Sequence, residues 1–143
     1  MTAANEFKPL SLCVLTVSDS RTPDNDSSGD WLCDALREAG HRLHERGIVR
    51  DDRYALRAIA SRWIADAAVD GVIVTGGTGF TGRDSTPEAL LPLLDKEMPG
   101  FGELFRQVSF EEIGTSSLQS RAFAGLANQT FLFCLPGSTS ACR

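Results

Sequence analysis

Apolar and polar positions follow one another along the chain in blocks that predict alternating strands and helices. Residues 11–18 form an almost continuous apolar, β-prone run, which is typical of a strand covered on both faces in a parallel sheet. A polar stretch at 19–28 follows, and apolar residues then recur at helical spacing from Trp31 to Ala39, where Gly40 ends the pattern. Strand, polar loop and helix together predict a first β-α unit.

The same order continues through the middle of the chain. A second strand is expected within 41–49, although its alternation of apolar and polar residues is imperfect, and Asp51 and Asp52 follow it. The next helix has the strongest periodicity in the chain, carried by Leu56, Ile59, Ala60, Trp63, Ile64 and Ala67. The short apolar run at 72–75 is bounded by glycines on both sides and predicts a third buried parallel strand.

The last third of the chain predicts two more helices and a hairpin. A helix capped by Thr86, with a proline at its first position, is expected to run to residue 97, and a second amphipathic helix is expected at 101–108. Two apolar stretches, 122–127 and 130–135, are joined by a short polar turn and predict an antiparallel hairpin.

This order of elements predicts an α/β protein of three layers. We expect a mostly parallel central sheet with helices on both faces and an antiparallel hairpin near the C-terminal end. With 42% hydrophobic residues, the 143 residues are expected to form one domain, 1–143. The stretch 135–143 begins like another strand, loop and helix and then stops, so we expect that a final C-terminal helix is missing from this chain.

Charge and cysteine content narrow the possible partners and the compartment. Fourteen basic and nineteen acidic residues give a net charge of −5, and no run of Lys or Arg is present, which argues against nucleic acid or an anionic membrane as a partner. The N-terminus lacks the regions of a signal peptide, so the cytoplasm is the expected location. The four cysteines have no metal-binding spacing and are expected to be buried, reduced thiols.

Candidate chemistry lies just past the ends of the predicted strands, where open parallel sheets bind ligands. The candidates after the first and last strands are Ser18, Asp19 and Ser20, and Pro136, Gly137 and Ser138. After the third strand stands a loop of glycines and hydroxyls formed by Thr75, Gly76, Gly77, Thr78 and Gly79. Such a loop lets backbone N–H groups approach a phosphate closely, and the alternative is a tight turn that needs positive φ angles.

Two carboxylates near this loop point to a divalent cation. Asp84 stands beside Arg83 at the far end of the loop, and Asp51 follows the second strand. Carboxylates repel a phosphate unless a cation lies between them, and Mg²⁺ binds one or two carboxylates together with phosphate oxygens. The pattern predicts metal-assisted phosphoryl or nucleotidyl transfer. The alternative is that Asp51 or Asp52 caps the next helix and that Asp84 stabilises a turn.

Other known phosphate and nucleophile motifs fit less well. Residues 77–82 match Gly-x-Gly-x-x-Gly, but the next helix is predicted to begin only near Thr86 and no acid ends a strand twenty residues on, as a dinucleotide site requires. The chain has no Gly-Lys-Ser/Thr sequence, which excludes a Walker A loop. No Ser/His/Asp or Cys/His grouping has a convincing location, which disfavours hydrolysis through a covalent intermediate.

Taken together, these segments resemble the MoaB/MogA family of molybdenum cofactor biosynthesis proteins, to which the G domain of gephyrin is related. The resemblance is carried by LTVSDSR at 15–21, TGGTGFTGRDSTPEA at 75–89, EMPGFGE at 97–103, SFEEIGTS at 109–116 and LPGS at 135–138. It extends over nearly the whole chain, and the 109–116 segment is closer to the MoaB branch.

The resemblance implies a molybdopterin-binding fold and a molybdopterin adenylyltransferase that uses Mg-ATP. Asp51 and Asp84 correspond by motif position to the family's catalytic aspartates and are expected to hold Mg²⁺. The other site residues are expected to bind molybdopterin or the nucleotide. The family also implies a homotrimer or homohexamer and a downstream protein that inserts molybdate. The alternative is a protein that binds molybdopterin in the same pathway without catalysis.

Overall fold

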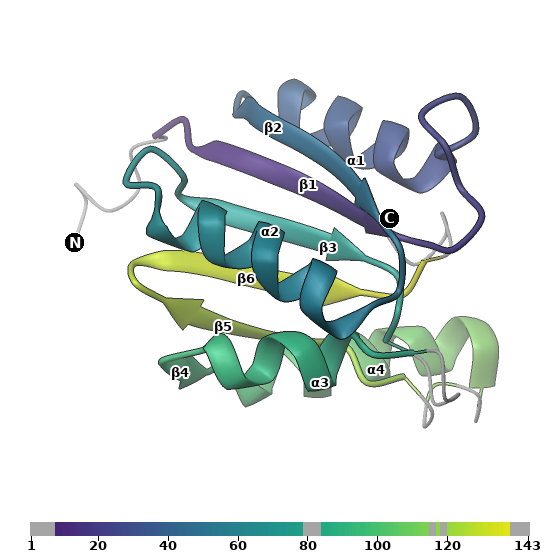
Figure 1. The fold of residues 1–143 in the computed structure, drawn as a ribbon. Coiled ribbons are helices and arrows are strands. Elements are labelled where there is room, and N and C mark those ends of the chain that lie inside the picture. Colours follow the sequence, from purple (N-terminus) through teal and green to yellow (C-terminus); the bar gives the residue numbers. More distant parts are fainter. Residues whose placement is uncertain (1–7, 79–83, 115–116, 118–119, 138–143) are drawn as a thin grey trace.

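Six strands form one sheet in the computed structural model, which describes residues 8–78, 84–114, 117 and 120–137. The strand order is β2-β1-β3-β6-β5-β4 (Figure 1). Neighbours among β1, β2, β3 and β6 pair in parallel, while β5 runs antiparallel to both β6 and β4. The strands are β1 Ser11–Val17, β2 Arg42–Val49, β3 Gly71–Thr75, β4 Lys96–Glu97, β5 Phe123–Ala127 and β6 Thr130–Leu135. The predicted α/β fold with a mostly parallel sheet is confirmed.

Helices cover both faces of this sheet, as predicted (Figure 1). The side chain of Val14 in β1 packs against α1, whereas its neighbours Cys13 and Leu15 belong to the core formed with α2 and α3. Because alternate side chains of a strand point to opposite faces, burial on both sides explains the continuous apolar run of β1. The helices are α1 Ser27–Glu38, α2 Arg53–Ala65, α3 Thr86–Leu90 and α4 Pro99–Ile113, with a 3-10 turn η2 at Leu91–Leu93.

Helix α4 packs near the antiparallel end of the sheet. The ring of Phe101 meets the ring of Phe133 in β6 edge to face, with centroids 5.4 Å apart. Phe133 is in register with Ile73 of β3, and Ile73 packs against the core cluster that contains α1. Side chains in register on adjacent parallel strands share a face, so α4 lies on the α1 side. Among the described ranges, no helix is long and apolar enough to cross a membrane.

The helix expected up to residue 97 is wrong in both its cap and its length. Ser85 is the N-cap residue of α3, and Thr86 is its first residue. The helix ends at Leu90 because Pro92 has no N–H to donate to the carbonyl of Glu88, four residues earlier. That carbonyl accepts a bond from Arg57 Nη2 at 3.1 Å instead. Strand β4 then forms within the segment that was predicted as helix.

The hairpin at the C-terminal end is confirmed. Its turn residues, Asn128 and Gln129, both have positive φ angles, 46° and 70°, which gives the twist that joins two tightly paired strands. The expected buried thiols are also found, since the three cysteines of the described ranges are free and buried, while Cys142 lies outside those ranges. The single domain and the further helix beyond residue 143 stay predictions.

Candidate functional site

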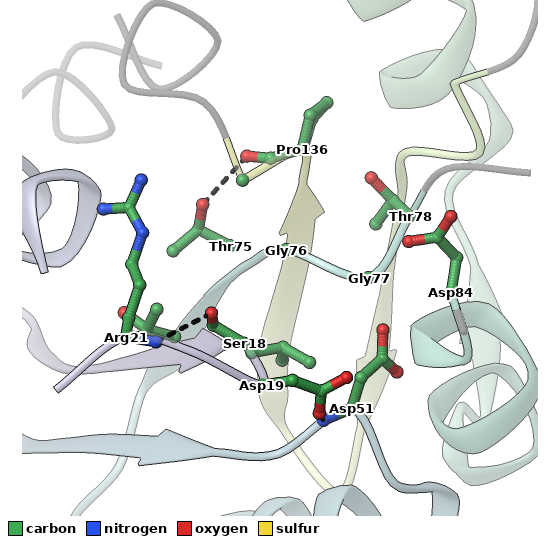
Figure 2. Close-up of a pocket in the computed structure, with 13 residues that line it drawn as sticks. Ser18, Asp19, Arg21, Asp51, Thr75, Gly76, Gly77, Thr78, Asp84 and Pro136 are labelled. Carbon is green, nitrogen blue, oxygen red and sulfur yellow. Dashed lines mark hydrogen bonds between the residues drawn. The ribbon is translucent and has the colours of Figure 1, made fainter. Parts of the chain in front are cut away.

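A cavity of about 440 Å³ opens where the carboxyl ends of the parallel strands meet (Figure 2). Its lining residues come from the last residues of β1 and β3, which include Thr16, and from the segments that follow all four parallel strands. The predicted site residues that line it are Ser18, Asp19, Asp51, Thr75, Gly76, Gly77, Thr78, Asp84, Pro136 and Gly137. Ser20 is not among the lining residues, although its N–H donates to Ser18 Oγ at 3.2 Å. Gly79, Arg83 and Ser138 lie outside the described residues.

The glycine loop turns sharply beneath this cavity. Gly76 and Gly77 have φ angles of +108° and +69°, which favour glycine. A Cβ atom on Gly76 would lie 2.2 Å from the carbonyl oxygen of Val17, so the ends of β3 and β1 approach closely only because this side chain is missing. The tight turn with positive φ angles is therefore confirmed. Such a turn does not exclude a phosphate site, which stays a prediction. The N–H of Gly76 is engaged with Leu135 O at 2.8 Å, so a phosphate would meet other donors of the loop.

One of those donors is the hydroxyl of Thr78. Its Oγ1 atom is buried and has no hydrogen-bond partner within the described ranges, although Thr78 lines the cavity. A buried polar atom without a partner is unfavourable in a folded protein unless a ligand or water satisfies it. The hydroxyl of Thr75, by contrast, donates to Pro136 O at 2.8 Å and ties the ends of β3 and β6 together (Figure 2). Thr78 is thus placed to contact a ligand and Thr75 to shape the wall.

The side chains of the two adjacent aspartates after β2 make different contacts. Asp52 caps α2, because its Oδ1 accepts from the N–H groups of Tyr54 and Ala55 at 2.8 and 2.9 Å. Asp51 lines the cavity, and its Oδ1 accepts from the N–H of Ser85 at 3.0 Å and from the Ser85 hydroxyl. Its own N–H donates to Asp19 Oδ1 at 3.2 Å. The capping interpretation is therefore correct for Asp52 and wrong for Asp51.

Acidic and basic side chains take opposite sides of the cavity. The carboxylates of Asp51 and Asp84 stand on one side, and the guanidinium of Arg21 stands on the other (Figure 2). Arg21 is the one cationic side chain among the described lining residues, and its Nη1 donates to Ser27 Oγ at 3.0 Å at the start of α1. We did not predict Arg21 as a site residue. Its place three residues after Ser18 within the first strand-end segment was the available signal.

Near Arg21, the buried carboxylate of Asp26 links the cavity wall to α1 and β2. Asp26 has no exposed surface and accepts hydrogen bonds from Thr16 Oγ1 at 2.7 Å, Gly29 N at 3.0 Å and Arg46 Nη2 at 3.0 Å. Burial alone would raise the pKa of this carboxyl, but these three donors together lower the pKa below its usual range. Asp26 is therefore an anion that both caps α1 and fixes the wall residue Thr16.

The donor set of the cavity suits one kind of metal ion. Within the described ranges, no three His, Cys, Asp or Glu side chains gather into a metal-binding cluster. The described lining residues offer carboxylate and hydroxyl oxygens and neither thiol nor imidazole, which favours a hard cation over zinc. Mg²⁺ is commonly held by one or two carboxylates, with water and substrate phosphates as its other ligands. Asp51 and Asp84 fit that requirement.

The structure is an α/β protein with a cavity at the carboxyl ends of its parallel strands, lined by a glycine loop, carboxylates and a guanidinium. A family model described as "Probable molybdopterin binding domain" matches residues 13–143. Molybdenum cofactor biosynthesis protein B of Escherichia coli strain K12 is 56% identical over 140 residues, which are 98% of this chain and 82% of that protein. The protein of the same name from Bacillus subtilis strain 168 is 44% identical over 131 residues, which are 91% of this chain and 77% of that protein.

Solved structures give the same result. A crystal structure of a molybdenum cofactor biosynthesis protein B superposes with a TM-score of 0.92 at 43% identity, covering 95% of this chain and 85% of the other. The chain therefore belongs to the MoaB/MogA family of molybdopterin-binding domains. The predicted resemblance is confirmed.

Proposed function

We propose that this protein works in molybdenum cofactor biosynthesis, where it binds molybdopterin in the strand-end cavity and adenylylates it with Mg-ATP. The observation that carries the proposal is that Asp51 and Asp84, from distant segments, line one cavity together with the glycine loop. The names of its relatives support the pathway, and the family description supports molybdopterin as the ligand.

The proposed reaction joins two phosphates. An oxygen of the terminal phosphate of molybdopterin attacks the α-phosphorus of ATP and forms a new P–O bond. The bond between the α-phosphorus and its bridging oxygen breaks, and pyrophosphate leaves with that electron pair. A phosphate monoester is already ionised at neutral pH, so the reaction needs no general base, which agrees with a described cavity lining without histidine.

The protein would contribute positioning and charge. Asp51 and Asp84 would hold Mg²⁺, which neutralises phosphate charge when it is bound. Arg21, on the opposite side of the cavity, would pair with an anionic oxygen. Thr78 Oγ1, which has no hydrogen-bond partner among the described residues, would donate to the ligand. With Asp51 and Asp84 on one side and Arg21 on the other, the bound ligand would have one preferred orientation in the cavity.

We further propose a homotrimer or homohexamer in the cytoplasm that passes its product to a molybdate-inserting protein. Apolar side chains on α4 support self-association, because they are more than half exposed in the single chain: Leu104, Val108, Phe110 and Ile113. The cysteines within the described ranges are free and buried, which agrees with a reducing compartment. Light scattering of the purified protein measures the number of subunits, and a monomer would contradict the assembly.

The test of the function is adenylylation by the purified protein, with Asp84→Asn as the variant. Chromatography should detect adenylyl-molybdopterin and pyrophosphate from the wild type, and the rate should fall by about 100-fold or more in Asp84→Asn, while molybdopterin still binds. Asp34→Asn is the matched control, because Asp34 is an exposed carboxylate on α1 outside the cavity lining. Tight molybdopterin binding without product from the wild type would favour the non-catalytic alternative.

A further inference from the structure

Arg121 lies two residues before β5, yet it contacts both described flanks of the glycine loop. Its backbone N–H donates to Thr78 O at 2.8 Å, and its Nη2 donates to Asp84 O at 2.8 Å. Its Nη1 forms an ion pair with Glu88 on α3. Thr78 and Asp84 are the described residues on the two sides of 79–83, so one arginine connects the beginning of the loop, its end and the helix that follows.

The contact with Asp84 is made to a peptide group that is held from both edges. The carbonyl of Asp84 and the N–H of Ser85 belong to the same planar peptide unit. Arg121 Nη2 binds the carbonyl, and Asp51 Oδ1 accepts from the N–H at 3.0 Å. With both edges bound, the plane cannot rotate freely about the Cα atom of Asp84. The Cα atom of Asp84 lies in this plane, so the two contacts hold in place the point from which the Asp84 carboxylate extends.

We propose that Arg121 is a positioning residue that aims the Asp84 carboxylate into the cavity by holding the Asp84–Ser85 peptide opposite Asp51. The guanidinium suits this task because its planar fork binds Glu88 and the Asp84 carbonyl at the same time, which a single ammonium does less well. The role for catalysis rests on the proposed function, whereas the positioning itself does not.

Hydrogen exchange tests the positioning without any ligand. In Arg121→Met, the Ser85 N–H should lose protection and exchange about ten times faster or more, because the peptide loses one of the two hydrogen bonds that restrain it. The matched control is Arg57→Met, since Arg57 also donates to α3 carbonyls, those of Ala89 and Glu88, but does not contact the loop flanks. Ser85 exchange should stay at the wild-type rate in this control. Unchanged exchange in Arg121→Met would overturn the proposal.

Magnesium dependence of adenylylation tests the consequence for the site. The Mg²⁺ concentration for half-maximal rate should rise about 10- to 100-fold in Arg121→Met, the usual range for residues that orient a metal-binding side chain, with little change in molybdopterin binding. Arg121→Lys should give an intermediate value. Glu88→Gln removes the ion pair but leaves the Asp84 carbonyl contact, so it should have a much smaller effect. An equal effect in Glu88→Gln would show that anchoring of α3, rather than positioning of Asp84, is responsible.

The two measurements separate this proposal from the proposed function. If the wild type forms no product, the adenylyltransferase proposal fails, and the exchange of Ser85 still decides whether Arg121 holds the peptide. Thermal unfolding of each variant shows whether it is folded. If Arg121→Met does not fold, Arg121→Lys takes its place in the exchange experiment, and wild-type protection of Ser85 in that variant overturns the proposal.

Discussion

Replacing Asp26 with asparagine changes a buried anion while keeping its size. In the wild type, its two oxygens accept hydrogen bonds from Gly29 N, Thr16 Oγ1 and Arg46 Nη2. In Asp26→Asn, the remaining carbonyl oxygen can still cap α1 at Gly29. The amide NH₂ group then faces the other two partners. The Thr16 hydroxyl can rotate and accept a bond, but the guanidinium of Arg46 has only donors and loses this contact.

The expected loss of unfolding free energy depends on the contacts that Arg46 retains in Asp26→Asn. A hydrogen bond to a charged group contributes about 1.5–3 kcal/mol, and breaking a fully buried ion pair costs about 3–5 kcal/mol. Arg46 is partly exposed and retains Asp30 Oδ1 at 2.8 Å, so its charge is not left unpaired. We therefore expect Asp26→Asn to lower the free energy of unfolding by about 2–3 kcal/mol at neutral pH. Asp30→Asn, which removes the exposed partner, should cost less than about 1 kcal/mol.

The pH dependence has a definite sign. The pKa of the Asp26 carboxyl is below its usual range in the folded protein, so the unfolded chain binds this proton more readily. The stabilisation is present above the unfolded pKa, about 4, and is lost as pH falls through the folded pKa. The difference between wild type and Asp26→Asn should therefore decrease below pH 4 or so.

Urea unfolding followed by tryptophan fluorescence measures both quantities. All samples need one protein concentration, because an oligomer's unfolding midpoint depends on concentration. A loss smaller than about 0.5 kcal/mol at neutral pH would refute the reasoning, since it is the size of an ordinary surface substitution. A difference that stays constant into acid would show that the charge of Asp26 is not what stabilises the fold.

Two further predictions concern the core and the turn beneath the cavity. Gly76→Ala should lower the free energy of unfolding by more than about 2 kcal/mol, because its Cβ would lie 2.2 Å from the Val17 carbonyl at a φ of +108°. Gly100→Ala, whose Cβ would meet no described atom within 4 Å, should be neutral or stabilising, and thermal unfolding measures both variants. In a Cys142→Ser variant, iodoacetamide should modify the three buried thiols only after unfolding, because burial raises their pKa values, that of Cys13 to about 12; modification of the folded protein would contradict this.

The parallel core of the fold was predictable because its signals are local. The run of β1 needs apolar residues on both faces, and the periodicity of α2 needs one apolar stripe, so each pattern has one simple structural solution. The segment after α3 was not predictable in the same way. Lys96 and Glu97 are exposed and helix-compatible, and they form β4 only because Gly125 and Leu126 of β5 lie beside them. Pairing across that distance leaves no periodic pattern in a strand of two residues.

The candidate site was likewise predictable where its signals are local and not where it depends on long-range contacts. Strand ends identified most of the cavity lining, because parallel strands bring their carboxyl ends to one edge whatever the loops do. Arg121 was missed because its contacts with Asp84 and Glu88 join segments more than thirty residues apart, and an arginine before a strand has no distinctive spacing. Long-range side-chain contacts to backbone carbonyls of this kind depend on the folded loop rather than on any local pattern.

Asp51 and Asp52 show where sequence reasoning reaches its limit. Either carboxylate is a suitable N-cap for the helix that follows, and the sequence alone gives no reason to prefer one. The fold decides between them, because Asp52 binds the first N–H groups of α2 and Asp51 then extends toward Ser85. A deletion of one residue at this position would leave a single carboxylate for two tasks. The paired aspartates thus allow the helix to be capped while an anionic side chain remains in the cavity.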